Sequence, residues 1–370
     1  VTPHFYPENF RINDLAYELK NRSHDVTVLT AIPDYPEGKF HKGYGLFKKN
    51  FEIHNGINIY RSAIIPRGSG RKLKLILNYT SFIISSIFTS LFLLKKSFDI
   101  IFIFAPSPIT VSIPAIFIKK IKKIPICLWI QDLWPESVSS SGYIKSKSLL
   151  KLLKGLVKYI YKNCDKIMIP SKGFKSSILK IGGVSPNNIE FIPNWAEKIF
   201  KVINNPKKEL KYIPNDSFKI MFAGNLGIAQ DFNSILLSAK ILKEYKNIQW
   251  LVLGQGSRLE WIKKKIKEYE LNDCFHLLGR FPMNDMPQFF SYADAMLFSL
   301  KSDEIYSLTI PSKVQSYLAC GKPILGMIDG EASQLIKNSK AGLSCPAGDY
   351  VSLSKNILKM KNMSKEQLKK

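Results

Sequence analysis

Short apolar runs typical of β-strands alternate with segments of helical period along nearly the whole chain of 370 residues. Because a parallel crossover needs a helix between its strands, this alternation predicts parallel sheets flanked by helices. In the first half the predicted strands cover residues 26–30, 57–62, 100–104, 126–130, 166–169 and 190–192. In the second half they cover residues 219–223, 249–253, 274–278, 295–298 and 323–327. The chain is therefore expected to form two α/β sheets.

The length of the chain favours two domains, because domains typically have about 150 residues and single hydrophobic cores stop growing beyond about 250–300. The stretch following residue 193 is rich in Lys, Asn and Pro, as linkers are. We predict one domain over residues 1–193, a linker over 194–214 and a second domain over 215–370. We also expect a fragment: only Val1 and Thr2 precede the first helical pattern as strand residues, and a helix opened by Ser364 stops soon afterwards.

The charge is strongly basic, with 54 Lys and Arg against 29 Asp and Glu, a formal net charge of +25. This balance attracts anionic membranes, nucleic acid or diphosphate ligands, although a codon bias toward lysine would produce it too. Nucleic acid is not expected as a partner, because arginines are few and no interleaved aromatic stripe is present. The five scattered cysteines and five histidines show no metal-ligand spacing, so no metal or cofactor and a reducing cytoplasm are predicted.

Residues 73–94 form an apolar stretch with lysines on both sides, diluted by Ser, Thr and Asn. Its length would cross a bilayer, but its polar content is high for a spanning helix. Three interpretations stay open: an interfacial helix on an anionic leaflet, a helix packed within the protein, and a membrane span.

Glycines follow two predicted strands of the second half: Gly224 and Gly227 come after the first strand, and Gly254 comes after the next. Glycine allows backbone N–H groups to approach a phosphate closely. Ordinary strand-to-helix turns would have the same sequence, so this signal alone is weak.

A helix with clear ends begins near Pro311, which suits the first helical position, and Gly321 suits its C-terminal stop. We expect about three turns. The free N–H groups at its start, with Ser312 and Lys313, would suit a diphosphate. The alternative is a capped core helix with a solvated lysine.

Several motifs together resemble family 4 glycosyltransferases of the GT-B architecture. They lie at residues 222–227, 292–294, 310–323 and 341–349 in the second half and at residues 6–16, 24–30 and 35–39 in the first. The similarity covers nearly the whole chain and is greatest to bacterial surface-polysaccharide members similar to L-fucosamine transferases. It implies two Rossmann-like, doubly wound domains that face a central cleft, with the acceptor bound by the first and the nucleotide-sugar by the second.

The resemblance implies transfer of a sugar, with retention, from a nucleoside-diphosphate donor, which we expect to be UDP-linked. An N-acetylated amino or deoxy sugar would be moved to a lipid-linked saccharide in O-antigen or capsule biosynthesis. The enzyme would work in the cytoplasm, peripherally at the inner face of the plasma membrane. A metal is not required, because a helix dipole and a lysine can stabilise the leaving diphosphate.

Two departures from the family pattern affect the predicted donor site. The usual pair of glutamates is replaced by Leu308 and Ser316, so we expect the ribose to be bound through Gln315 or Ser316. The family's positive charges in the glycine loop are replaced by Asn225 and Gln230.

The charge that meets the diphosphate must then come from elsewhere. Lys313 and Arg280 are the candidates, although Arg280 could equally be a solvated surface residue.

Residues of the first half supply the predicted acceptor side. Asp132 follows a buried strand and is the predicted catalytic residue, positioning the acceptor or taking its proton, with Glu136 as second choice. Asp132 could instead cap the next turn.

The loop before the first helix replaces a glycine pair common in the family. We expect Glu8, Asn9 and Arg11 to line the roof of the cleft, with helix capping as the alternative for Asn9. Asp34 and Tyr35 would help to define the acceptor pocket.

Two other functions remain open. A sugar-nucleotide 2-epimerase shares the two-domain arrangement, but it needs carboxylates that the replacements at Leu308 and Ser316 remove. A non-catalytic membrane-associated scaffold would also be compatible with the missing glutamates.

Overall fold

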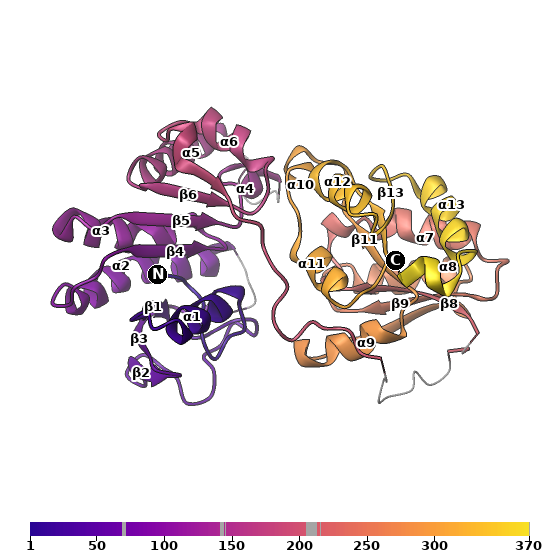
Figure 1. Cartoon of the computed structure of the whole chain (residues 1–370), viewed down its shortest axis with the longest axis horizontal. Coiled ribbons are helices and arrows are strands. Elements are labelled where there is room, and N and C mark those ends of the chain that lie inside the picture. Colours follow the sequence, from indigo (N-terminus) through magenta and orange to yellow (C-terminus); the bar gives the residue numbers. More distant parts are fainter. Residues whose placement is uncertain (69–71, 141–143, 145, 205–212, 215, 370) are drawn as a thin grey trace. The chain divides into compact units, whose positions relative to one another are not determined.

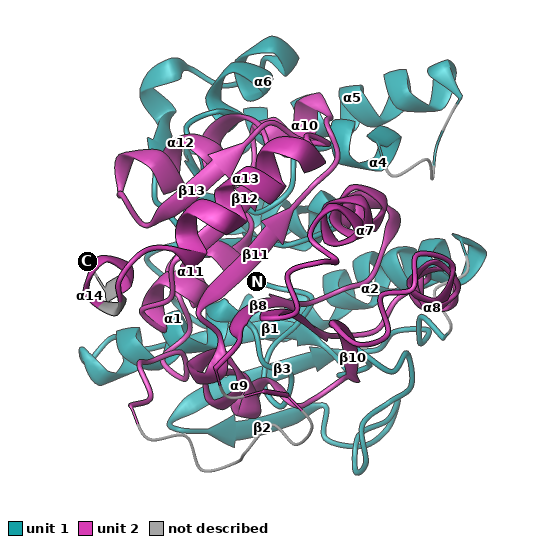
Figure 2. Ribbon diagram, turned by 90° about the vertical axis from the view of Figure 1, so that its right-hand side faces the viewer, with its two compact units in different colours: residues 1–193 teal, residues 194–370 magenta. Residues whose placement is uncertain are grey.

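The computed structural model describes residues 1–68, 72–140, 144, 146–204, 213–214 and 216–369. The chain divides into two units, Val1–Pro193 and Asn194–Lys370, which Figure 2 shows in different colours. Most of the second half of the predicted linker, residues 205–212, lies outside the described residues. Each unit is described by itself.

The second unit contains a six-stranded sheet in which every pair of neighbours is parallel (Figure 1). Its strands are β8 (Phe218–Ala223), β9 (Ile248–Leu253), β10 (Phe275–Gly279), β11 (Ala295–Ser299), β12 (Ile324–Met327) and β13 (Gly342–Cys345). Their spatial order is β10-β9-β8-β11-β12-β13, the order of a doubly wound Rossmann-type sheet. Successive strands are therefore added on one side of β8 as far as β10 and on its other side from β11 onward, so the strand order reverses between β8 and β11.

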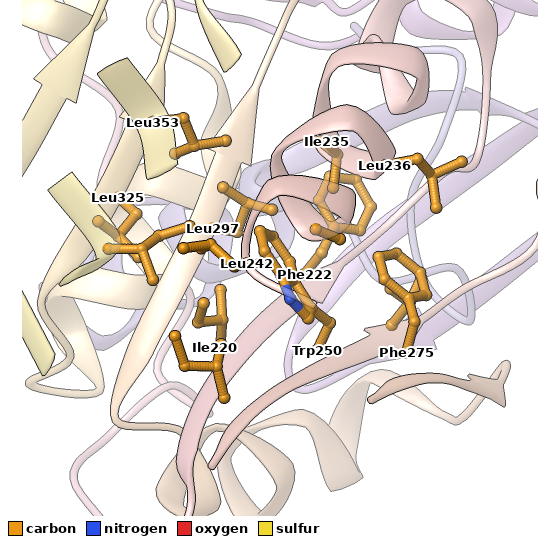
Figure 3. Close-up of a cluster of buried hydrophobic side chains, with 14 of the residues drawn as sticks. Ile220, Phe222, Ile235, Leu236, Leu242, Trp250, Phe275, Leu297, Leu325 and Leu353 are labelled. Carbon is orange, nitrogen blue, oxygen red and sulfur yellow. The ribbon is translucent and has the colours of Figure 1, made fainter. Parts of the chain in front are cut away.

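Helices cover both faces of this sheet. Successive residues of a strand point to opposite sides, so each face carries apolar side chains that a layer of helices buries. Ile220, Phe222 and Trp250 join a cluster with α7 and α13 on one face, drawn in Figure 3, whereas Met221 and Leu251 pack with α9, α11 and α12 on the other. The helices are α7 (Phe232–Ile241), α8 (Leu259–Glu268), α9 (Met286–Tyr292), α10 (Glu304–Ser307), α11 (Ser312–Ala319), α12 (Gly330–Asn338), α13 (Tyr350–Lys361) and α14 (Lys365–Lys369). Short 3₁₀ turns lie at η3 (Ile228–Gln230) and η4 (Met283–Asp285).

The first unit contains two sheets. Four parallel strands, β4 (Ile101–Ala105), β5 (Ile126–Ile130), β6 (Lys166–Ile169) and β7 (Ile189–Phe191), form one sheet in that order. In the other, β1 (Thr27–Ala31) pairs in parallel with β3 (Ile57–Ser62), which also pairs antiparallel with β2 (Phe51–His54).

Residues Val1 and Thr2 connect these two sheets through backbone hydrogen bonds. The N–H of Thr2 donates to Leu29 O at 3.0 Å on β1. On the other side the Val1 amino group donates to Phe102 O at 2.6 Å, and Phe104 N–H donates to Val1 O at 3.0 Å, the pattern of a parallel ladder. The loop that follows Thr2 therefore starts between the ends of β1 and β4.

The helices of the first unit are α1 (Arg11–Asn21), α2 (Lys72–Leu93), α3 (Ser112–Lys122), α4 (Glu136–Ser140), α5 (Lys147–Lys162) and α6 (Phe174–Ile181), with 3₁₀ turns η1 (Ile109–Val111) and η2 (Pro186–Asn188). Among the described residues, α2 alone is long and apolar enough to cross a bilayer by length and composition. It packs against β1, β3 and α3.

The α/β prediction is confirmed, and each predicted strand is present to within one residue at either end. The expectation of one sheet in each half is wrong for the first half, whose strands form two sheets. Strands β2 and β13 were not predicted. The capping pattern at Ser364 is also confirmed, because Ser364 N–H donates to Gln367 Oε1 at 2.8 Å and Gln367 N–H to Ser364 Oγ at 3.2 Å.

Candidate functional site

The candidate site of the second unit lies where the strand order reverses. In doubly wound sheets ligands bind beyond the carboxyl ends of the strands at such a point. Here the loop after β8 carries Gly224, and two contacts join that loop to the end of β11: Ser299 Oγ donates to Gln230 O at 2.6 Å, and Lys301 N–H donates to Ala229 O at 2.9 Å. The predicted glycine loop is therefore fixed at the switch point.

Close backbone packing explains two of the predicted glycines. Gly224 and Gly254 have φ of +139° and +147°, and a Cβ on Gly254 would lie 1.8 Å from Gly224 O. Glycine is needed for this approach whether or not a phosphate binds. Gly227 N–H is already engaged, because it donates to Gln230 Oε1 at 3.0 Å. A phosphate could therefore accept from the Gly227 N–H only by displacing the side chain of Gln230.

Helix α11 is anchored above the end of β8 by Tyr317. The fully buried phenol accepts from Ala223 N–H at 3.2 Å and donates to Ala223 O at 3.1 Å. The predicted start of the helix was wrong by one residue, since Pro311 is extended with ψ of 145° and forms the N-cap. The predicted length was also too great: α11 has eight residues, just over two turns, because the chain leaves helical geometry at Cys320.

Lys313 is turned inward beneath the glycine loop. Its Nζ lies 4.1 Å from the centre of the Phe222 ring, and a Cβ on Gly224 would lie 2.8 Å from Nζ. The Nζ atom is buried and has no hydrogen-bond partner among the described residues. Burial disfavours its charged form and lowers the pKa of Lys313 to about 7. Lys313 is therefore a buried amine next to a helix N-terminus.

The other predicted residues of this helix start are placed differently. Ser312 is exposed. Ser316 Oγ donates to Ser312 O at 3.2 Å. In the amide orientation that satisfies both of its side-chain atoms, Gln315 donates through nitrogen to Ser312 O at 3.0 Å and to Pro311 O at 2.9 Å. Both predicted ribose ligands thus hydrogen-bond to their own helix, and either would have to turn outward to bind a ribose.

Arg280 and Asn225 lie at the same edge of the sheet. Arg280 is exposed directly after β10, and the preceding Gly279 accepts from Gly254 N–H at 2.7 Å. The amide of exposed Asn225 covers Gly227, whose Cβ position is 2.7 Å from Asn225 Nδ2. No salt bridge of Arg280 is found among the described residues.

A second polar cluster lies between the loop before α1 and the loop after β1 in the first unit, and it contains three of the predicted acceptor-side residues. Buried Glu8 accepts through Oε1 from Asp34 N–H at 2.8 Å and Tyr35 N–H at 2.7 Å, and its Oε2 pairs with His4 Nδ1 at 2.7 Å. Glu8 therefore joins the loop before α1 to the loop after β1. Single ligand atoms of His4, Glu8 and Asp34 lie within 4.8 Å of one another.

Sequence reasoning missed two residues that complete this cluster. Arg67 donates its backbone N–H to Asp34 Oδ2 at 2.9 Å and places Nε 3.6 Å from Asp34 Oδ1. Asn78 of α2 donates to Asp34 Oδ2 at 3.2 Å. Burial nevertheless raises the pKa of Asp34. Arg67 already faces Asp34, and Glu8 is engaged by His4 and two backbone N–H groups. Both carboxylates therefore have partners within the protein, and we assign no metal to the cluster.

The cluster borders a cavity of about 20 Å³, enough for roughly one water. Residues lining it include His4, Asp34, Arg67 and Ser107. Ser107 Oγ also accepts from Trp134 Nε1 at 3.2 Å, which ties the loop after β4 to the loop after β5. The cavity is too small for a saccharide as it stands.

Asn9 and Arg11 differ from each other in their surroundings. Asn9 is exposed, and the N-cap of α1 is Phe10, which has no capping side chain. The capping alternative for Asn9 is therefore wrong. Arg11 is the first residue of α1 and is 6% exposed.

Asp132 lies in the loop after β5, as predicted. Burial raises its pKa to about 6, and among the described residues no hydrogen bond or salt bridge to its carboxylate is found. Glu136 begins α4 and has contacts of its own. An ionisable group whose pKa is raised toward neutrality by burial, without a structural partner, is typical of functional sites.

Solved structures with the same architecture define the fold class. Sucrose-phosphate synthase from Thermosynechococcus elongatus matches with a TM-score of 0.74 and 14% identity, covering 97% of this chain and 84% of that one. HepE of Anabaena, solved with UDP and glucose, matches with a TM-score of 0.68 and 14% identity over 97% and 87%. The fold is that of a GT-B glycosyltransferase.

The family follows from the sequence. Residues 10–197 match the family model described as Glycosyltransferase Family 4, and residues 194–370 match the model described as Glycosyl transferases group 1. The chain belongs to the family 4 glycosyltransferases. A relative assigned to colanic acid biosynthesis as a glycosyl transferase, WcaI of Escherichia coli strain K12, is 22% identical over 82% of this chain and 75% of its own. The resemblance to family 4 is confirmed, and the epimerase and scaffold alternatives are set aside; fucosamine specificity stays a prediction.

Proposed function

We propose that this glycosyltransferase moves a sugar from a UDP-linked donor, with retention, to a lipid-linked saccharide in surface-polysaccharide biosynthesis. The observation that carries the proposal is Lys313, whose buried amine lies beside the N-terminus of α11 and has no hydrogen-bond partner in the part of the chain that the structure describes. A buried lysine amine next to the positive end of a helix dipole forms a binding site for an anion such as a diphosphate.

The donor side is assigned to residues 194–370. The first N–H groups of α11 have no partner within the helix and carry the positive end of its dipole. A diphosphate at Gly224 would meet these N–H groups and, through a small movement of the side chain, Lys313 Nζ. As the sugar leaves, negative charge grows on the diphosphate, and both groups stabilise it. Arg280 at the same edge would add a further positive charge.

The acceptor side is assigned to residues 1–193. The carboxylate of Asp132, with its pKa raised to about 6, would position the acceptor hydroxyl or take its proton near neutral pH. Glu136 is a second candidate for this role. The cluster formed by Glu8, Asp34 and His4 fixes the loops that would bind the saccharide, with Tyr35 and Asn9 at its edge.

The comparisons support the donor and process only by similarity. HepE of Anabaena was solved with UDP and with UDP-glucose, and the E. coli relative is named for colanic acid biosynthesis. For this chain we propose a UDP-linked donor that carries an amino or deoxy sugar. The product would be an O-antigen or a capsule polysaccharide, and the enzyme would work at the inner face of the plasma membrane.

The test is sugar transfer from a panel of labelled UDP-sugars to a lipid extract that contains diphosphate-linked saccharides. We expect one donor to label the lipid fraction, with the anomeric configuration retained in the product. Conversion of the donor to another sugar without acceptor would contradict transfer, and so would a panel of UDP-sugars that neither binds calorimetrically nor labels lipid.

A further inference from the structure

Helix α2 has its polar side buried and its apolar side exposed, the reverse of an ordinary surface helix. Its buried residues are Asn78, Phe82, Ser86, Ser90 and Leu93. Its exposed large apolar residues, here called the α2 outer face, are Leu73, Ile76, Leu77, Ile84, Phe88, Leu91 and Phe92. At about 100° per residue, the two sets lie on opposite sides of the helix.

Hydrogen bonds fix α2 in this orientation. Asn78 donates to Ile65 O at 2.7 Å, Ser81 Oγ accepts from Ile65 N–H at 2.9 Å, and Thr89 Oγ1 accepts from Ser62 Oγ at 3.1 Å. Turning the apolar side inward would break these bonds and leave polar groups unpaired. The exposure of the α2 outer face is thus built into the packing of the first unit.

The loop before β2 extends this apolar surface. Phe40 and Leu46 of the loop line an open groove of about 460 Å³ together with Ile84 and Phe88 of the α2 outer face. Next to Leu46, Phe47 is 94% exposed. A contiguous apolar surface of this kind is rare on a protein that meets only water.

The charge around this surface has one sign. Residues 53–98 contain no Asp or Glu and seven Lys or Arg, and residues 38–51 contain four Lys and no acid. Lys72 and Lys74 lie at the start of α2, Lys95 follows its end, and Lys48 follows Phe47. An apolar strip with basic ends is complementary to a bilayer with anionic headgroups. A second copy of this chain would instead bring like charges together.

We propose that the α2 outer face and Phe47 dock on the surface of an anionic lipid bilayer, with Lys48, Lys72, Lys74 and Lys95 at the headgroups. The helix lies in the interface and does not span, because its other side is bound to β3 and the Asp34 cluster. This deepens the proposed function and rests on it: the same helix contributes Asn78 to Asp34, so docking would place the acceptor-side cluster one helix away from the membrane that holds a lipid-linked acceptor.

The test is co-sedimentation of the full chain with vesicles of phosphatidylcholine, with or without phosphatidylglycerol. Wild type should bind the anionic vesicles at low salt, and F88S/F92S and K48E/K95E should each bind about tenfold more weakly or worse. The matched control, I241S/V351S, alters exposed apolar residues of the second unit and should bind as wild type does.

Undiminished binding by F88S/F92S, or equal binding of wild type to both kinds of vesicle, would overturn the proposal. Lipid-free dimers that F88S/F92S dissociates, without vesicle binding, would overturn it in favour of a second copy. UDP binding, measured on the same variants, should not change. Wild type that binds vesicles but no nucleotide would contradict the proposed function and not the docking surface.

Discussion

The ammonium nitrogen of Lys313 lies 4.1 Å from the centre of the Phe222 ring, and it has no hydrogen-bond acceptor among the residues that the structure describes. The ring face offers a weak substitute for an anion. Burial lowers the pKa of Lys313 to about 7, so the lysine is about half protonated near neutral pH. A bound diphosphate would supply the missing negative charge and raise that pKa again.

Binding of UDP should therefore take up a proton. At pH 8 the free site is mostly neutral, and raising the pKa of Lys313 would draw close to one proton, about 0.9, from solution. Calorimetry in buffers that differ in ionisation enthalpy measures this uptake. It should disappear in K313M. Equal heats in all buffers for wild type at pH 8 would contradict the assignment of Lys313.

Asp132→Asn should raise the stability of the protein and lower its transfer activity. The folded state raises the pKa of Asp132 to about 6 from 3.8, so the protonated form is favoured by folding and stability falls as pH rises through 6. D132N should thus melt higher than wild type at pH 7.5, with little difference at pH 4, while transfer falls by about 10²-fold or more.

Asp165 provides the opposite control, because its Oδ2 accepts from Lys119 Nζ at 2.5 Å and Ile126 N–H at 2.7 Å, and its pKa is lowered. D165N should lower the melting temperature at pH 7.5, with the loss disappearing at acid pH. If D132N instead lowers the melting temperature at pH 7.5, the buried charge of Asp132 is structural.

Glu8→Ala should destabilise the first unit by about 3 kcal/mol, because it removes a buried carboxylate that accepts from two backbone N–H groups and pairs with His4. The neighbouring N9A should change the unfolding free energy by less than about 0.5 kcal/mol, since Asn9 is exposed. Urea unfolding measures both. Equal, small effects would show that Glu8 does not join the two loops.

Two glycine substitutions should have opposite effects. G254A places a Cβ 1.8 Å from Gly224 O at a φ of +147°, so it should unfold or distort the donor loop and abolish UDP binding. Gly155 lies inside α5 with nothing within 4 Å of its Cβ position, and G155A should stabilise by about 1 kcal/mol. Thermal melts and UDP titration would compare them, and unimpaired binding in G254A would contradict the close approach.

Periodicity was sufficient to predict the two Rossmann-like domains, because buried parallel strands are apolar runs separated by helices. It missed β2, whose alternating exposure is weak, although Asn55 and Gly56 have φ of 49° and 72° and are a hairpin signal in the sequence. Short β13 was missed because it contains only four residues, two of them Gly342 and Ser344.

The sequence predicts where several candidate side chains lie in the fold, but not their burial or their partners. Sequence spacing placed Lys313 and Asp132 at strand or helix ends. It could not show that Lys313 Nζ is buried or that Asp132 is half-buried, with no salt bridge to either among the described residues, since burial depends on residues far along the chain such as Phe222. Arg67 and Asn78 were missed because they reach Asp34 from a loop and a helix with no motif. The orientation of α2 likewise depends on hydrogen bonds from β3 and the segment that follows it, which an apolar stretch does not reveal.

The most direct measurement compares UDP binding by wild type, K313M and K322M in calorimetric titration, with thermal melts of each. Lys322 Nζ donates to Ser291 O at 2.9 Å and Ala293 O at 2.7 Å, so K322M should lose stability and keep wild-type affinity. K313M should keep or gain stability, because the amine that it removes has no hydrogen-bond partner among the described residues, and it should bind UDP at least about tenfold more weakly. Wild-type affinity in K313M would contradict a diphosphate site at the switch point of the second unit.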